Sequence, residues 1–271
     1  MRARAEWFSS AEYTGALGVA ASRPAKHPGL RPRGGRVCCS ALSDDVSFID
    51  IVSKIGYRSS MSYIAARRVE EKERRRGEIL DAAEVLYAKE GWDLVTLDQI
   101  ARGARLSRAL VYVYFEDKED ILFAIGERAM CLLRDRFIAA SAGQKLGMEK
   151  VEAIGRAYMA YAFEFPHYFD FCSKFHAHAG SPEQGSHDMG CRAAGDEAIG
   201  VVVRAIECGI ADGSIRPSIG DPMMLALTLW SFTHGLIQLA MAKGNDMARF
   251  GIGIPELSNY GFGLLRSMSQ S

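Results

Sequence analysis

The sequence carries no net charge, because its 33 lysines and arginines equal its 33 aspartates and glutamates in number. A neutral protein has no overall field that would attract nucleic acid or an anionic membrane, so any such binding requires a local basic patch. Hydrophobic residues make up 48% of the 271 residues and charged residues 24%. These proportions are typical of a soluble globular protein, and we expect most of the chain to fold.

The six cysteines include no CxxC pair, and Glu6 and Glu12 interrupt the segment in which a signal peptide would lie. The pattern excludes a zinc ribbon and a secreted disulfide framework, and it favours a reducing, cytoplasmic location. Only residues 223–242 are long and apolar enough to span a bilayer, yet they contain His234 and Gln238. We interpret this segment as a buried helix and expect no membrane partner.

Enzyme motifs are also missing, since the sequence has no GxSxG element, no paired catalytic carboxylates and no phosphate-cradling loop. We therefore expect no catalytic activity and no cofactor. The alternative is a helical metal-binding protein or a metal-assisted hydrolase that uses Cys172, His176, His178 and His187, which are common ligand types for transition metals. Because no second motif fixes the geometry of these residues, we expect no metal site.

Residues 1–60 differ in composition from the rest of the chain. The stretch SRPAKHPGLRPRGGRVCCS is rich in proline, glycine and arginine and has no hydrophobic periodicity, which predicts disorder. One hypothesis is that synthesis starts at Met61, so that residues 1–60 do not belong to the native protein. The other is that they form a natural basic arm that follows DNA phosphates.

Helical periodicity begins after Met61, and no alternating strand pattern interrupts it. The first apolar face, formed by Ile79, Leu80, Ala83, Leu86 and Tyr87, ends at Gly91. In the C-terminal half, helices are expected at about 149–165, 168–178, 191–211, 222–242 and 255–268, with breakers between them. The sequence therefore predicts an all-α fold.

Two short helices joined by a tight turn, TLDQIARGARLSRALVYVYF, are the most specific feature of the sequence. Thr96 and Gln99 have the spacing of a capping box, Ser107 can cap the second helix, and Asp117 can cap a further helix that begins at Lys118. These lengths are typical of a helix-turn-helix, whose second helix enters the major groove of DNA.

The second of these helices has two distinct faces. Val111 and Phe115 share one face and should anchor the helix in a core. The opposite face carries Ala109, Leu110 and Val113, which can approach base edges and thymine methyl groups but cannot donate hydrogen bonds. We therefore expect this face to lie in the groove.

Polar contacts to DNA are expected around that face. The acid-free window 100–115 contains Arg102, Arg105 and Arg108, which supply the local basic patch, and Arg108 in the first helical turn is the expected base reader. Phosphate contacts are expected from Tyr112 and Tyr114, from the helix N-termini near Thr96 and Lys118, and from the arginines at 74–76.

The stretch 78–123 resembles the DNA-binding domain of the TetR family of transcriptional regulators, through its T-x-x-x-I-A, L-S-x-x-x-x-Y-x-Y-F and K-E-x-L-like elements. The C-terminal half resembles one ligand-domain branch of that family, through Tyr158, the E-x-P of residues 164–166, IECGIADGSIRP and WSFTHG. We accordingly expect a helix-turn-helix domain at 61–125 and a ligand-binding and dimerisation domain at 126–271.

The resemblance implies a homodimer that binds a palindromic double-stranded DNA operator, usually as a repressor, until a small molecule enters the C-terminal domain. Many members carry other residue types where Ala109, Leu110 and Val113 stand, so the operator sequence stays open. The expected DNA-binding residues are Thr96, Arg105, Ser107, Arg108, Ala109, Leu110, Tyr112, Val113, Tyr114 and Lys118.

Helix-spaced aromatic residues in the C-terminal half are candidates for an apolar ligand cavity, although such residues often belong to a plain core. An apolar or aromatic effector is the resulting hypothesis. Residues 222–242 and 255–268 are apolar enough to form a two-fold dimer interface. A helical interaction protein without a DNA role is the remaining alternative. The candidate ligand-binding residues are Tyr158, Tyr161, Phe165, Phe169, Trp230 and His234.

Overall fold

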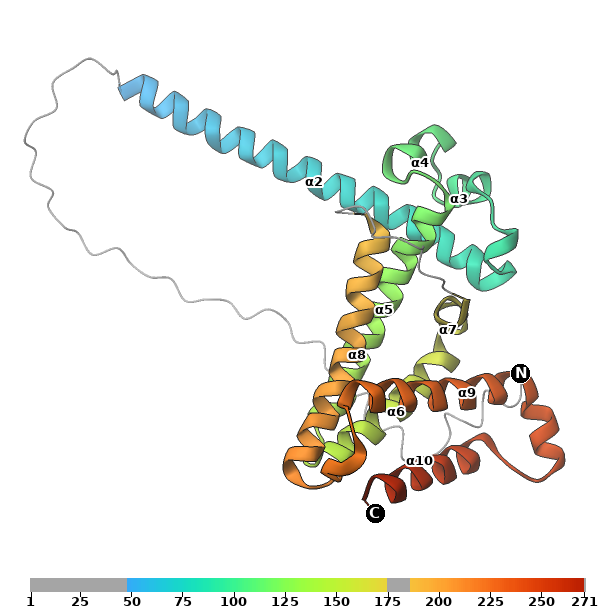
Figure 1. Cartoon of the computed structure of the whole chain (residues 1–271). Helices are drawn as coiled ribbons and strands as arrows, with labels where there is room; N and C mark the ends of the chain where they lie inside the picture. Colours follow the sequence, from blue (N-terminus) through green and yellow to red (C-terminus); the bar gives the residue numbers. More distant parts are fainter. Residues whose placement is uncertain (1–47, 175–185, 271) are drawn as a thin grey trace, which may run out of the picture. The chain divides into compact units, whose positions relative to one another are not determined.

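The structure, a computed structural model, describes residues 48–174 and 186–270, and every regular element in these ranges is helical (Figure 1). The predicted all-α fold is therefore confirmed. In chain order the elements are α2 (Phe48–Glu90), η1 (Trp92–Leu94), α3 (Leu97–Gly103), α4 (Arg108–Tyr114), α5 (Lys118–Ala142), α6 (Gly147–Glu164), α7 (Pro166–Lys174), α8 (His187–Asp212), η2 (Pro217–Ile219), α9 (Pro222–Arg249) and α10 (Ile254–Gln270).

Helix α2 begins at Phe48, ahead of the helix start that the sequence indicates at Met61. The segment FIDIVSKI lacks the prolines and glycines of the residues before it, so nothing in it breaks a helix. A boundary between two compact units falls within α2, after Gly77. Before this boundary, the Glu71 carboxylate accepts hydrogen bonds from Arg74 (2.6 Å) and Arg75 (3.0 Å), and these bonds lower its pKa.

The remainder of α2 packs with α3 and α4 into a three-helix head, here defined as residues 78–115. Its core contains Ile79, Ala83, Ile100, Val111 and Phe115, each at most 2% exposed. The apolar face predicted for α2 and the anchoring face predicted for α4 are thus both confirmed.

All three helix caps predicted in and next to the head are present. The Thr96 hydroxyl accepts a hydrogen bond from Gln99 N (3.3 Å), while Thr96 N donates to Gln99 Oε1 (2.7 Å), which completes a capping box. Ser107 Oγ accepts from Leu110 N (3.2 Å) at the start of α4. Asp117 caps α5 in the same way. Such caps contribute about 1 kcal/mol each, and here they fix where short helices begin.

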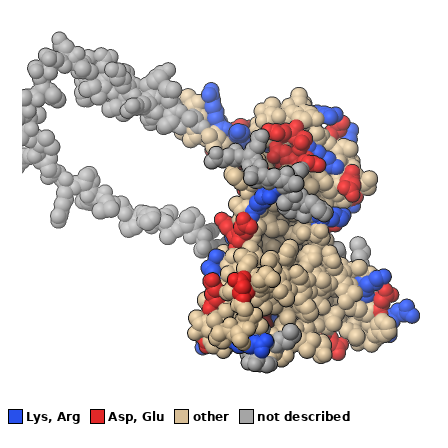
Figure 2. Space-filling model, viewed as in Figure 1, with Lys and Arg blue, Asp and Glu red and all other residues tan. Residues whose placement is uncertain are grey.

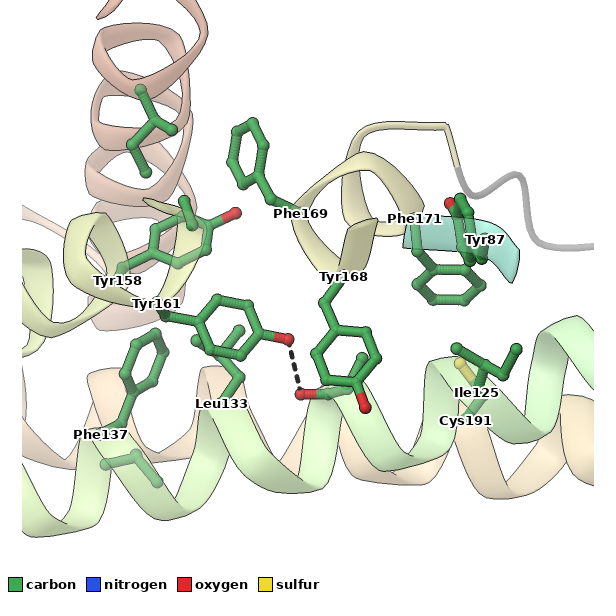
Figure 3. Close-up of a cluster of buried hydrophobic side chains, with 14 of the residues drawn as sticks. Tyr87, Ile125, Leu133, Phe137, Tyr158, Tyr161, Tyr168, Phe169, Phe171 and Cys191 are labelled. Carbon is green, nitrogen blue, oxygen red and sulfur yellow. Dashed lines mark hydrogen bonds between the residues drawn. The ribbon is translucent and has the colours of Figure 1, made fainter. Parts of the chain in front are cut away.

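Helices α5 and α8 lie side by side, and α6 packs against both (Figure 1). Aromatic side chains of α6 and α7 fill the space next to α5 (Figure 3). Tyr161 is fully buried there, and its hydroxyl donates a hydrogen bond of 2.9 Å to the carbonyl of Ala129 on α5. This bond removes the cost of burying a phenol hydroxyl without a partner.

Helix α6 begins where it crosses the end of α8 at close range. A Cβ atom on Gly147 would overlap the backbone of Gly209 and stand 2.7 Å from the carbonyl oxygen of Ala205. The first amides of α6 bond to α8 and the turn after it, Gly147 N to Asp212 (2.7 Å) and Met148 N to Ser214 (3.0 Å). The crossing therefore requires glycine.

Helix α9 differs from the expectation in two ways. It continues to Arg249 through a kink at Lys243, where the sequence had indicated a loop. By length and composition its segment Pro222–Gly244 could cross a membrane, which for one such helix is weak evidence. Only 22% of its most apolar window is buried. The interpretation of this segment as a buried helix is therefore wrong for the single chain, in which most of the helix lies at the surface.

Candidate functional site

The turn between α3 and α4 holds Arg105 in a left-handed conformation, with φ at 58°. Leu106 N then donates a hydrogen bond of 2.9 Å to the carbonyl of Ala101, which closes the turn at the end of α3. A side chain in this region costs about 1 kcal/mol or more relative to glycine. The chain tolerates this cost at the point that sets the direction of α4.

Helix α4 presents the face that the sequence assigned to DNA. Val113 is 69% exposed and Tyr112 is 46% exposed. Ala109 is also exposed, and Leu110 and Tyr114 are half-buried at the edges of this face. The structure thus brings the predicted groove-facing residues together on the exposed side of a helix whose other side is held in the core.

Arg108 is held at the surface of the head by two neighbours. Its guanidinium lies 3.3 Å from the Asp98 carboxylate and 3.2 Å from the Tyr112 hydroxyl, and these contacts raise its pKa. Asp98, in the first turn of α3, lies just outside the acid-free window 100–115, so the sequence pattern did not indicate this pair. An exposed ion pair of this kind is weak, so Arg108 can exchange it for another acceptor.

Three of the other predicted polar residues, Lys118, Thr96 and Ser107, already make hydrogen bonds within the protein. Lys118 Nζ donates a hydrogen bond of 2.7 Å to the carbonyl of Trp92 and lies 5.1 Å from the centre of its ring. The Thr96 and Ser107 hydroxyls serve as helix caps. Lys118 keeps further N–H donors, and it lies in the first turn of α5, where a helix dipole favours a phosphate.

A cavity of about 520 Å³ lies among the helices of the C-terminal half. This is within the usual range for small-molecule sites. Its wall is mainly apolar and is formed by residues of α5, α6, α7, α8, α9 and α10, among them Met130, Phe137, Met148, Val151, Tyr158, Phe171, Val202, Leu229, Trp230, Thr233 and Phe262.

The six candidate ligand-binding residues divide between the cavity wall and the layer behind it. Tyr158 and Trp230 line the cavity. The other four, Tyr161, Phe165, Phe169 and His234, are packed against one another or against Tyr158, as the ring contacts show. The wall residues contributed by α5, α8 and α10 escaped sequence analysis, because only the tertiary packing brings them together.

Polar side chains behind the wall form a hydrogen-bonded chain. Trp230 Nε1 donates to the Tyr158 hydroxyl (3.3 Å), which lies 2.8 Å from His234 Nδ1. His234 Nε2 lies 3.2 Å from Ser173 Oγ, which in turn donates to the carbonyl of Phe169 (2.9 Å). Burial lowers the pKa of His234, so its ring is neutral and can accept at one nitrogen and donate at the other. The chain therefore links the cavity wall to α7.

Several side-chain contacts join the head to the cavity-bearing helices. Tyr87 Oη on α2 donates a hydrogen bond of 3.0 Å to Asp170 on α7. Arg128 on α5 bonds to Asp81 and Glu84 of α2, at 2.8 and 3.2 Å. At the end of α4, the Phe115 ring lies 5.5 Å from the ring of His187, the first residue of α8. A movement of α5, α7 or α8 therefore reaches the head through direct contacts.

The proposed metal ligands are not assembled in the described part of the chain. His176 and His178 lie outside the described residues. Cys172 lies at the cavity, whereas His187 lies next to Asp120 and Glu127, at 3.9 and 3.7 Å. Among the residues that the structure describes, no group of three or more potential ligands could hold a metal ion.

Two family models match the chain. Residues 79–125 match the model described as bacterial regulatory proteins, tetR family, and residues 151–250 match the model described as tetracyclin repressor-like, C-terminal domain. The first covers the head, and the second covers most of the cavity wall. Together they account for both parts of the candidate site.

Curated relatives and solved structures agree with these matches. The regulator HbdR of Aromatoleum is 49% identical over 51 residues, which cover 19% of this chain and only 22% of HbdR. The repressor NicS of Pseudomonas putida is 28% identical over 156 residues, 56% of this chain and 71% of NicS.

Three solved structures share the fold. A protein of unknown function from Rhodococcus has a TM-score of 0.62 at 24% identity, over 73% of this chain and 96% of that one. FadR of Bacillus subtilis, solved with stearoyl-CoA, has a TM-score of 0.55 at 18% identity, and the match covers 70% of this chain and 97% of FadR. AibR, solved with isovaleryl coenzyme A and operator DNA, has a TM-score of 0.53 at 18% identity, and the match covers 70% of this chain and 97% of AibR.

Proposed function

This chain belongs to the TetR family of transcriptional regulators, and we propose that it is a repressor that binds a palindromic operator as a homodimer and releases it when an apolar effector enters the cavity. The observation that carries the proposal is that the head, which presents the exposed α4, is joined to α7, a helix that contributes to the wall of a cavity of ligand size, through the bond from Tyr87 to Asp170. Because the effector and the DNA bind different parts of one connected unit, each can change the affinity for the other.

The exposed face of α4 supports operator recognition. We assign base reading to Arg108, which leaves Asp98 on binding, and apolar contact with bases to Ala109, Leu110 and Val113. Tyr112, Tyr114, Arg105 and Lys118 surround this face, and phosphate contacts from such positions set the register of a helix in the groove. Thr96 and Ser107 contribute through the helix N-termini that they cap.

The exposed apolar faces of α9 and α10 support a homodimer. On α9, Met224 is 65% exposed and Trp230 is 44% exposed, and on α10 Tyr260 is 67% exposed. Figure 2 shows a largely uncharged area in the centre of the lower part of the molecule, with charged side chains at its edges. A large exposed apolar surface is unfavourable in a monomer, and a two-fold interface would cover it. Pairing through these helices would also place two copies of α4 on one DNA duplex.

The apolar wall supports a small, largely apolar effector. FadR and AibR were solved with acyl-coenzyme A molecules, and NicS is named a repressor, so repression relieved by a small molecule is consistent with these relatives. We assign the effector contacts to Tyr158 and Trp230 in the wall. Phe169 and His234 support these two, while Tyr161 and Phe165 shape the aromatic layer behind them.

Selection of bound sequences from random duplex DNA tests this function directly. We expect an enriched inverted repeat, bound by a dimer with an affinity that falls steeply as the salt concentration rises. A strictly monomeric protein that shows no salt-dependent affinity for DNA would contradict the proposal and would favour a helical interaction protein.

A further inference from the structure

The charged residues in the cavity wall leave no cation available for a ligand. Arg192 is the basic residue in the wall, and it bonds to Asp188 through Nε (2.9 Å) and Nη2 (3.1 Å). Glu152 receives two hydrogen bonds of 2.5 Å from Arg266. The third charged residue, Asp196, is an exposed acid. A carboxylate inside this cavity would therefore meet acidic groups and a cation that already has a partner.

Burial at the cavity wall also disfavours ionised groups. Cys172 and Cys191 both lie in its wall, and burial raises the pKa of each thiol to about 12. The cause is desolvation of the charged form, which acts in the same way on any ionised group placed beside them. A ligand carboxylate would lose its hydration without gaining an ion pair.

One hydroxyl in the wall is free to bind a ligand. Thr233 is 4% exposed and lines the cavity, and in the described part of the chain no assigned hydrogen bond uses its hydroxyl. On the same helix, Thr228 and Ser231 each donate to the carbonyl four residues earlier, at 2.8 Å. The Tyr158 hydroxyl is already engaged with Trp230 and His234. A hydroxyl that faces an apolar cavity can donate a hydrogen bond to an acceptor atom of a ligand placed there.

We infer that the cavity binds an apolar acid only in a neutral carbonyl form, either an ester or a thioester. The free carboxylate is rejected. Thr233 Oγ1 donates a hydrogen bond to the carbonyl oxygen of the bound ester or thioester. The inference rests on the proposed function, because it treats the cavity as the effector site. It places an uncharged group and its apolar body inside the cavity. A simple ester and a coenzyme thioester share this chemistry, and the experiment separates them.

Matched probes test the inference on the full chain by calorimetry near neutral pH. The probes are undecanoate, its methyl ester and its coenzyme A thioester, together with 2-naphthoate and its methyl ester as a second body shape. We expect saturable binding of an ester or thioester, and at least tenfold weaker binding of the matching carboxylate. A coenzyme A thioester that binds much more tightly than the methyl ester would identify a coenzyme thioester as the source.

Three variants locate the contact. Thr233→Val keeps the shape but removes the hydroxyl, and it should weaken ester binding by about three- to tenfold, the loss of one hydrogen bond. Thr233→Ser retains the hydroxyl and should stay within about twofold of the native affinity. Thr228→Val removes a hydroxyl that bonds only to its own helix, and it should leave the affinity unchanged.

The outcomes separate the inference from the proposed function. Carboxylates that bind as tightly as their esters, an ester affinity that Thr233→Val leaves unchanged, or no saturable binding of any ester or thioester would overturn the inference, while DNA binding would still stand. Conversely, Thr233-dependent binding of esters that never alters DNA affinity would support the inference and contradict the proposed ligand response.

Discussion

The hydroxyl of Tyr87 donates a hydrogen bond to the Asp170 carboxylate and thereby joins the three-helix head to α7. The Tyr87 ring also contacts His167 on α7, with 6.0 Å between ring centres. At its other side α7 carries Ser173, the last side chain of the hydrogen-bonded chain that starts at the cavity wall. Helix α7 is therefore bonded both to the head and to the polar side chains behind the cavity wall.

Removal of the Tyr87 hydroxyl should weaken the coupling between effector binding and operator binding. We expect Tyr87→Phe to lower the free energy of unfolding by about 1 kcal/mol, the contribution of one hydrogen bond. Operator affinity without effector should change little, whereas the change in affinity caused by the effector should shrink several-fold. Anisotropy titrations with and without effector measure this, with Tyr63→Phe, an exposed tyrosine, as the matched control. An unchanged effector response would rule out this contact as the link.

Arg108 and Lys118 should contribute to DNA binding in different ways. Arg108→Ala should cost about 1 to 3 kcal/mol on the operator and relax the preference among bases, because it removes a base contact. Lys118→Ala should weaken operator and random DNA equally and reduce the slope of affinity against salt. Titrations of both variants on both DNAs compare these effects. Equal losses on the two DNAs for Arg108→Ala would contradict its assignment as the base reader.

Because Lys118 also bonds to Trp92, its substitution requires a stability control. Denaturant unfolding of Lys118→Ala shows how much head stability is lost, and Lys118→Arg retains the positive charge. A salt slope that recovers in Lys118→Arg would show that the charge, rather than the fold, accounts for the loss.

A charge on the apolar face of α9 should prevent dimerisation. We expect Met224→Glu to convert the dimer to a monomer and to reduce operator affinity by a factor of ten or more, since each palindromic half-site would be bound alone. Sedimentation velocity reports the oligomeric state. Ile138→Glu places the same charge at an exposed position of α5 and should leave the dimer intact. A dimeric Met224→Glu variant would place the interface elsewhere.

Acid should destabilise the protein through His234. Burial lowers the pKa of this histidine from its ordinary value of 6.5, so the unfolded chain binds more protons than the folded chain as the pH falls below that value. The free energy of unfolding should therefore decrease as the pH drops from 7 toward 5. Denaturant unfolding across this range should show a smaller decrease for His234→Gln. His167, whose pKa is lowered in the same way, should account for part of what remains.

Local signals made most of the fold predictable from sequence. Thr96, Ser107 and Asp117 each cap the helix that follows them, and a cap depends only on residues three or four positions away. Val111 and Phe115 were predicted to be buried from helical periodicity alone, and they are. The end of α9 lies beyond the predicted end at residue 242, because the helix continues through the kink at Lys243 and tolerates Gly244 directly after it.

The site was less predictable, because its contacts join residues that are distant in sequence. Asp98 reaches Arg108 only because the turn at Arg105 folds α4 back toward α3. Tyr158 and Tyr161 have the same residue type and lie one helical turn apart. One lines the cavity, whereas the other bonds to Ala129, and only the position of α5 separates these outcomes.

Gly147 and Gly209, at the crossing of α6 and α8, each lie next to a residue of the cavity wall. Met148, which follows Gly147, lines the cavity, as does Ile215, which would touch a Cβ on Gly209. An alanine at position 147 would press against the backbone of α8, whereas an alanine at position 209 would press against the side chain of Ile215. A substitution at either glycine would therefore move a residue of the cavity wall without changing the residue types that form the wall.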